Sequence, residues 1–200
     1  MKKFLRYSIP VFLLAITGGA FAANDNKQIR HDFSKYLIER SWSNSIHGQK
    51  ESRPWFWIDA HPAARLDFPV LDKNIIVLSG EDKAARNYAP YWHEGSARAG
   101  EMGVSYIQGV PENFGFLKHL KSGDDFVLTT TNGQRISYKI HEIIVTEADT
   151  ISAQNGDSNV LILGTRFNYK NWNDRGNIMN YLVVAYSKKE KARHPDVASL

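Results

Sequence analysis

The sequence contains no cysteine. This absence excludes disulfide bonds, thiolate metal sites and thiol nucleophiles at once. Blocks of like charge, internal repeats and low-complexity segments are also missing, so nothing indicates a charged interaction tail or a repeat architecture. The cysteine-free composition fits any compartment, and the location of the protein has to be read from other features.

The apolar run at residues 9–22 is shorter than the roughly 20 residues that span a bilayer. It follows Lys2, Lys3 and Arg6, and it ends in the small-residue pattern of Ala20 and Ala22. A positive start, a short apolar run and small residues at the cleavage site are typical of a secretory signal peptide. We expect removal of residues 1–22. The alternative is an uncleaved N-terminal anchor.

The net charge of +4 is largely a property of this leader. Three of the 25 basic residues and none of the 21 acidic ones lie in residues 1–22, which leaves 22 basic and 21 acidic residues and a net charge of +1. A nearly neutral mature chain without a basic stripe gives no support to nucleic-acid binding. We therefore predict no nucleic-acid partner.

Hydrophobic periodicity predicts one helix followed by short strands. Apolar residues between Phe33 and Trp42 recur at helical spacing, and Gly48 is a natural stop. Asn132-Gly133 between two β-rich runs predicts a hairpin, while residues 114–120 read as a helical turn. The expected strands are residues 65–68, 74–78, 104–107, 126–128, 136–140, 143–145, 160–163 and 181–186.

Short strands with hairpin turns and few helices indicate a mainly β fold, an antiparallel barrel or sandwich. The predicted organisation is a signal peptide at 1–22, a helical segment at 23–50, a β domain at 51–190 and a polar tail at 191–200. Composition and periodicity predict this fold class but no function.

Three segments then resemble the sortase family. Residues 107–110 (IQGV) look like the strand that ends in Ala-Gly-His in that family, and residues 114–124 carry its Phe-x-x-Leu turn and its Lys/Arg-x-Gly-Asp pattern. Residues 160–165 (VLILGT) resemble the strand that ends in Thr-Cys. This resemblance implies a closed β-barrel of about eight strands with an N-terminal helix.

The first half of the chain sharpens the resemblance. Residues 36–42 (YLIERSW), 53–59 (RPWFWID), 62–66 (PAARL), 77–80 (VLSG) and 88–93 (YAPYWH) are similar to the sortases of Gram-negative bacteria, often called class GN. Together with the later segments, the likeness covers roughly residues 33–186. It implies a protein of the periplasm or cell envelope of a Gram-negative bacterium.

Sortases are cysteine transpeptidases in which a thiolate attacks a sorting signal, a histidine handles the proton and an arginine stabilises the oxyanion. Carried over to this sequence, the histidine position falls on Val110, the cysteine position on Arg166 and the arginine position on Asn180. The window 177–181 around the last position contains no arginine. The resemblance therefore implies a sortase fold with a degenerate triad.

Only two residues are candidates to substitute for the missing triad, and both are weak ones. Thr165 would need an adjacent base, and His119 is the conceivable one. The expected binding groove comprises Val110, Thr165, Arg166 and Asn180. A cation at position 166 could hold a peptide carboxylate or another anion, although a surface arginine paired with a nearby acid is the simpler reading.

The leading interpretation is an exported, catalytically inactive sortase homologue that binds a peptide sorting signal, a companion sortase or the target of that sortase. The alternatives are an active peptide hydrolase or transpeptidase with non-standard residues, and a scaffold whose groove binds nothing. We predict no cofactor and no metal, since the histidines and acids lack recognised ligand spacing. Membrane contact is expected only if the leader is retained.

Overall fold

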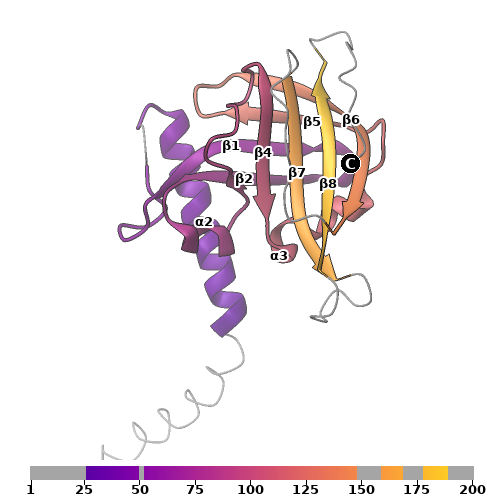
Figure 1. Cartoon of the computed structure of the whole chain (residues 1–200). Coiled ribbons are helices and arrows are strands. Elements are labelled where there is room, and N and C mark those ends of the chain that lie inside the picture. Colours follow the sequence, from indigo (N-terminus) through magenta and orange to yellow (C-terminus); the bar gives the residue numbers. More distant parts are fainter. Residues whose placement is uncertain (1–25, 50–51, 148–158, 169–177, 189–200) are drawn as a thin grey trace, which may run out of the picture. The chain divides into compact units, whose positions relative to one another are not determined.

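Eight β-strands close into a barrel, as the sequence predicted (Figure 1). The computed structural model describes residues 26–49, 52–147, 159–168 and 178–188. The leader 1–22 with its cleavage site and the tail 191–200 lie outside these residues. The strands are β1 (Ala60–Phe68), β2 (Lys73–Gly80), β3 (Tyr91–Trp92), β4 (Gly103–Gly109), β5 (Asp125–Thr130), β6 (Arg135–Thr146), β7 (Asn159–Asn168) and β8 (Ile178–Ser187).

The strand order around the barrel is β1-β2-β3-β4-β7-β8-β6-β5, and β5 pairs with β1 to close it. Short helices connect the strands, and one longer helix precedes them. They are α2 (Asn26–Ile46), η1 (Pro69–Leu71), η2 (Lys83–Asn87), α3 (Pro111–Phe114) and η3 (Gly115–His119). The mainly β barrel of eight strands with an N-terminal helix is thereby confirmed.

Two of the expected strands are wrong in detail. Residues 136–140 and 143–145 form one continuous strand, β6. The pairing with β8 shifts register between Ile140 and Glu142 but continues on both sides of the shift. The two-residue β3 was not predicted, since a strand of that length has no periodicity to detect. The count of eight strands holds because one strand was split and one was missed.

The barrel interior is filled from alternate positions of the strands. In β1 and β4 buried and half-buried residues alternate along the whole strand, as expected when one face of a strand lines a core. Three aromatic rings stack through the interior: Phe126 lies between Phe68 and Tyr138, with ring centroids 5.0 and 5.5 Å away. Each of these large rings buries more apolar area than an aliphatic side chain of the same core.

A second apolar cluster lies outside the barrel interior. The chain forms two compact units, Met1–Tyr36 and Leu37–Leu200, so the part of α2 from Leu37 onward belongs to the barrel unit. Within that part, Ile38 and Trp42 are buried together with Ile58 and residues of β2. The spacing of four residues puts both side chains on one face of the helix.

Parallel pairing of β4 and β7 sets the position of the site. The seven register pairs run from Gly103 with Asn159 to Gly109 with Thr165, so the carboxyl ends of the two strands meet (Figure 1). The antiparallel partner of β7 is β8, whose first residues therefore lie at the same end. Three strand ends are brought together although long segments separate them in sequence.

Candidate functional site

A pocket of about 190 Å³ lies at the carboxyl ends of β4 and β7. Its lining comes from four parts of the chain: η2, the β3 region, the end of β4 with the first residue of α3, and β7. The lining residues are Arg86, Tyr91, His93, Gln108, Gly109, Val110, Pro111 and Arg166.

A proline and a glycine shape the floor of this pocket. Val110 has extended backbone angles and Pro111 follows as the first residue of α3, a position that suits proline because that N–H has no helical partner. The Val110 carbonyl accepts hydrogen bonds from the N–H groups of Asn113 and Phe114, each at 2.9 Å. A Cβ at Gly109 would lie 2.7 Å from the fully buried Phe114 ring, so glycine is needed where the chain turns.

Arg166 lies on the outer face of β7. Leu161 and Leu163 belong to the barrel interior, whereas Val160 and Ile162 belong to a separate cluster on the opposite face. Because side chains alternate along a strand, Arg166 continues the outer face and Thr165 continues the inner one. Arg166 is accordingly exposed and Thr165 is buried.

Tyr106 packs on the outer face of β7, close to Arg166. A Cβ at Gly164 would lie 2.5 Å from the Tyr106 hydroxyl, so the ring covers β7 at the glycine just before the site. Burial raises the pKa of the Tyr106 hydroxyl above its ordinary value, and the positive charge of Arg166 acts in the opposite direction. The Arg166 guanidinium is therefore close enough to Tyr106 for its charge to act on that hydroxyl.

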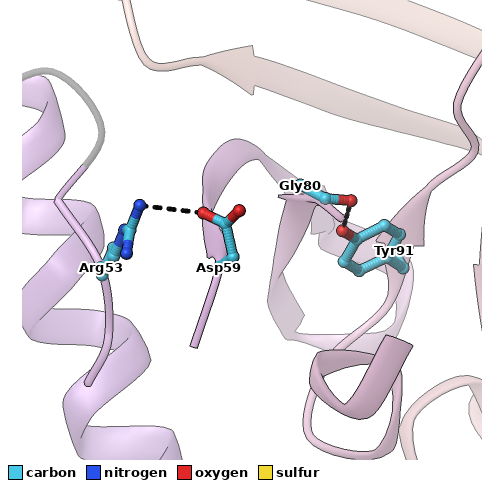
Figure 2. Close-up of polar contacts among 4 residues, drawn as sticks. All are labelled: Arg53, Asp59, Gly80 and Tyr91. Atoms are coloured by element: carbon cyan, nitrogen blue, oxygen red, sulfur yellow. Dashed lines mark hydrogen bonds and ion pairs between the residues drawn. The ribbon is translucent and has the colours of Figure 1, made fainter. Parts of the chain in front are cut away.

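Tyr91 and Arg86 form the opposite wall. The Tyr91 hydroxyl donates a hydrogen bond to the Gly80 carbonyl (Figure 2). In the segment before β1, an ion pair joins Arg53 to Asp59 at 2.9 Å (Figure 2). Burial, followed by the negative charge of nearby carboxylates, raises the pKa of Tyr91 to about 12. The Arg86 guanidinium lies 5.1 Å from the centre of the Tyr91 ring, a cation–π contact.

His93 lines the same pocket from the segment after β3. Its Nδ1 is 2.7 Å from the carbonyl oxygen of Glu94, and its ring centroid is 5.6 Å from that of Tyr106. A carbonyl oxygen can only accept, so Nδ1 carries the proton of this hydrogen bond. Nε2 is then the ring atom left to meet a ligand.

The predicted triad positions do converge. Val110 and Arg166 both line the pocket, and Asn180 is the register partner of Arg166 across β7 and β8, on the same face. Asn180 is buried and is not among the lining residues. Of the four groove residues expected from the sequence, the structure therefore brings Val110 and Arg166 to the pocket wall, whereas the buried Thr165 and Asn180 do not line the pocket.

The proposed substitute nucleophile and base are not paired. The Thr165 Oγ1 is buried without a hydrogen-bond partner in the described part of the chain, and His119 is exposed at the end of η3. A hydroxyl nucleophile needs a base within hydrogen-bond reach. The described residues supply no such base to Thr165.

Sequence reasoning missed Arg86, Gln108 and Pro111 as members of the site. Arg86 lies in a short helical turn with no motif of its own, so only the fold could bring it to the pocket. Within residues 26–49, 52–147, 159–168 and 178–188, no three acidic or histidine side chains lie close enough to hold a metal ion. No helix among these described residues has both the length and the apolar character to cross a membrane.

Comparisons with known proteins bear on the family and the fold. The Sortase domain family matches residues 66–188. No curated protein matches the chain. Among solved structures, the chain is similar to a sortase D5 transpeptidase of Clostridium perfringens, with 19% identity and a TM-score of 0.61 over 78% of this chain and 98% of the other.

Two further structures have the same fold. A lid mutant of sortase A from Corynebacterium diphtheriae is 18% identical, with a TM-score of 0.56 over 80% of this chain and 94% of its own. Sortase C of Clostridium perfringens with the C-terminal cell wall sorting motif is 19% identical, with a TM-score of 0.52 over 88% and 98%. At these identities the likeness shows the fold alone.

Proposed function

This chain belongs to the sortase family, which it matches over residues 66–188, and from that membership we propose that it is a catalytically inactive member that binds a peptide. The observation that carries the proposal is Arg166, a fixed cation in the pocket at the strand position where the sequence resemblance expects the nucleophile. An arginine cannot serve as a nucleophile because its guanidinium remains protonated. The chain has no cysteine that could take over.

The other two triad positions support the same proposal. Val110 has no titratable group, so it cannot move a proton, and Asn180 carries no positive charge to stabilise an oxyanion. Their backbones nevertheless lie where the strand ends meet. A degenerate triad on an intact scaffold fits a binding protein better than an enzyme.

Peptide binding is proposed from the position of the pocket. It opens at the end of the barrel where β4 and β7 finish, and a solved relative of the same fold holds the C-terminal cell wall sorting motif. By this reasoning the partner is a peptide sorting signal, a companion sortase or the target protein of that sortase. The scaffold needs no catalytic residue to hold any of them.

Class and location complete the proposal. The segments YLIERSW, RPWFWID and YAPYWH favour the class GN sortases of Gram-negative bacteria, and the leader favours export to the periplasm or cell envelope. Mass spectrometry of protein from the native envelope tests the export: a new N-terminus at Ala23 supports cleavage. Full-length protein retained in the membrane fraction would show that the leader stays attached as an anchor.

A turnover assay tests the inactivity. The purified protein is incubated with a quenched fluorescent peptide that carries a C-terminal cell wall sorting motif, beside an active sortase as the positive control. We expect no cleavage and no transpeptidation above background, because loss of a nucleophile costs on the order of a millionfold in turnover. Turnover that Thr165→Ala or His119→Ala abolishes would favour an enzyme with non-standard residues instead.

A binding measurement separates a binding protein from an empty scaffold. Fluorescence anisotropy of the same labelled peptide should rise on titration with the protein. Val110→Asp, which adds a carboxylate to the pocket wall, should weaken this binding, whereas Val70→Asp on the exposed η1 is the matched control. Absence of binding to peptide, to a companion sortase and to its target would support the empty scaffold.

A further inference from the structure

Two aromatic side chains lie exposed at the tip of a tight turn before β1. The Ile58 N–H donates a hydrogen bond to the Trp55 carbonyl at 3.3 Å, which places Phe56 and Trp57 at the two central positions of the turn. Phe56 is 86% exposed and Trp57 is 68% exposed, more than any other large hydrophobic residue in the described part of the chain. The turn belongs to the same compact unit as the barrel, the unit that begins at Leu37.

Aromatic residues are unusual at the tip of a turn. Central turn positions favour Gly, Pro, Asn, Asp and Ser, either for their backbone conformation or for their local hydrogen bonds. Large rings supply neither, and rings in water leave unused the stabilisation that their burial would give. The rings of Phe56 and Trp57 pack edge to face, with centroids 4.7 Å apart. The tip is therefore a contiguous apolar surface that the fold does not bury, which is a feature of interaction sites.

The base of the turn holds the two rings outward. Pro54 before the turn and Ile58 at its end are buried. The ion pair between Arg53 and Asp59, at 2.9 Å, joins the segments on either side of the turn (Figure 2). Because both ends are fixed, the tip cannot fold back to bury its rings without breaking these contacts.

The small area of the tip distinguishes between kinds of partner. A stable protein interface buries about 800 Å² on each side. One aromatic side chain supplies roughly 150–250 Å², so two of them fall well short of that area. The neighbouring Arg53 and Asp59 side chains are charged and more than half exposed, so they do not extend the apolar surface. A bilayer needs no matching surface, since apolar side chains enter its interfacial region individually.

The chemistry of the tip suits that interfacial region. Tryptophan combines a large apolar ring with an N–H donor and is enriched where membranes meet water. The Trp57 Nε1 makes no hydrogen bond within the described residues, so its N–H is available to an oxygen of a lipid headgroup. Arg53 and Asp59 compensate each other's charge, so the base of the turn brings no net charge toward the lipid.

We infer that the Phe56–Trp57 tip inserts into the interfacial region of a lipid bilayer and holds the barrel at the membrane surface. This contact is independent of the peptide binding proposed above, which uses the ends of β4 and β7. It is also independent of the leader, so a chain cleaved before Ala23 would keep it. Membrane contact is therefore not restricted to a chain that retains its leader.

Depth measurements on the full chain test the insertion. Because the chain contains no cysteine, a single introduced cysteine carries a nitroxide spin label without background labelling. Trp57→Cys places the label at the tip, and Val70→Cys is the matched control, since Val70 is exposed on η1 at the other end of β1. Both proteins are mixed with vesicles of phosphatidylethanolamine and phosphatidylglycerol. Electron paramagnetic resonance then measures the access of oxygen and of a water-soluble nickel chelate to each label.

The tip label should be relaxed more by oxygen, which dissolves in lipid, and the control label more by the nickel chelate, which stays in water. Phe56→Cys is a second tip label if Trp57→Cys loses its fold, which the melting temperature reports.

The unlabelled full chain gives an independent reading with lipids brominated on their acyl chains, which quench the fluorescence of nearby tryptophans. Trp57→Phe should lose most of this quenching. Trp55→Phe, at the half-buried start of the same turn, is the control and should keep it.

Three outcomes would contradict the inference, and each leaves the proposed peptide binding standing. Failure of the full chain to bind vesicles, or a tip label as accessible to the nickel chelate as the control label, would place the tip in water. Bromolipid quenching that is unchanged in Trp57→Phe would assign the lipid contact to another tryptophan. Immobilisation of the tip label by a companion sortase or by its target protein, without vesicles, would assign the tip to a protein partner.

Discussion

Single residues at the end of β7 determine which chemistry the fold can support. Arg166 and Asn180 are direct neighbours across β7 and β8 and share one face, while Thr165 faces the barrel interior. A side chain introduced at position 166 would therefore have position 180 as its nearest cross-strand neighbour. If the protein is inactive as proposed, the recovery of activity depends on the three side chains at positions 110, 166 and 180.

The first prediction concerns that recovery. Arg166→Cys with Val110→His should give little turnover of a sorting-motif peptide, because the oxyanion still lacks a cationic donor. Adding Asn180→Arg should then raise turnover about 100-fold, the usual effect of one oxyanion donor. The control replaces Arg166 with Ala in the same background. If Asn180→Arg adds nothing while all variants keep their melting temperatures, the assignment of position 180 is wrong.

The second prediction concerns Tyr91. Its pKa is raised to about 12 from an ordinary value near 10, so the unfolded chain loses this proton at lower pH than the folded one. The stabilisation is fully present below about pH 10 and is lost as the pH rises through about 12. An ultraviolet titration of tyrosinate should show an ionisation near pH 12 whose amplitude Tyr91→Phe reduces by one tyrosine.

Tyr88→Phe is the control for this titration, since its ring is more exposed and packs on Trp55 at 5.2 Å. The amplitude near pH 12 should be unchanged in that variant. An equal amplitude near pH 12 in Tyr91→Phe would show that the hydrogen bond to Gly80 and the burial of the ring do not protect this hydroxyl.

At the scale of elements, the sequence predicts the strands that have a clear hydrophobic pattern, but it does not predict features that depend on strand pairing alone. The Asn132-Gly133 hairpin and the strand before Gly109 have local signals that survive without tertiary context. The unbroken β6 depends on the ladder with β8, and β3 depends on two bonded neighbours. Pairing of this kind cannot be read from one segment.

The candidate site divides in the same way. Val110 and Arg166 follow strands that the sequence identifies, so their meeting could be predicted from strand ends. Arg86 reaches the pocket only because η2 folds back beside Tyr91, and no local pattern marks it. A residue that reaches a site only through tertiary packing cannot be identified from a single sequence.

The third prediction belongs to helix α2. Trp42 is 5% exposed and packs with Ile38, Ile58 and strand β2, whereas Phe56 in the following loop is 86% exposed. Trp42→Ala should lower the free energy of unfolding by about 3–5 kcal/mol, the usual cost of removing a buried aromatic ring. Phe56→Ala should change it by less than about 0.5 kcal/mol. Chemical denaturation of both variants measures the difference, and equal effects would contradict the packing of this helix on the barrel.

At the scale of the whole molecule, the closed barrel bonds β7 on both sides, to β4 and to β8. Opening β7 therefore means opening the barrel. Native-state hydrogen exchange should show the amides of Leu161 and Leu163 exchanging only through global unfolding, with the two-residue β3 opening at lower free energy. Exchange of β7 as fast as β3 would mean that the closure contributes little to stability.

The pairing of Gly109 with Thr165 also has a consequence for the order in which the chain is made. Synthesis proceeds from the N-terminus, so β4 is complete long before its neighbour β7 exists. The pocket cannot be completed until Arg166 has been added and β8 has paired with β7. A nascent or truncated chain that ends before β8 therefore lacks the complete pocket, which forms only near the end of translation.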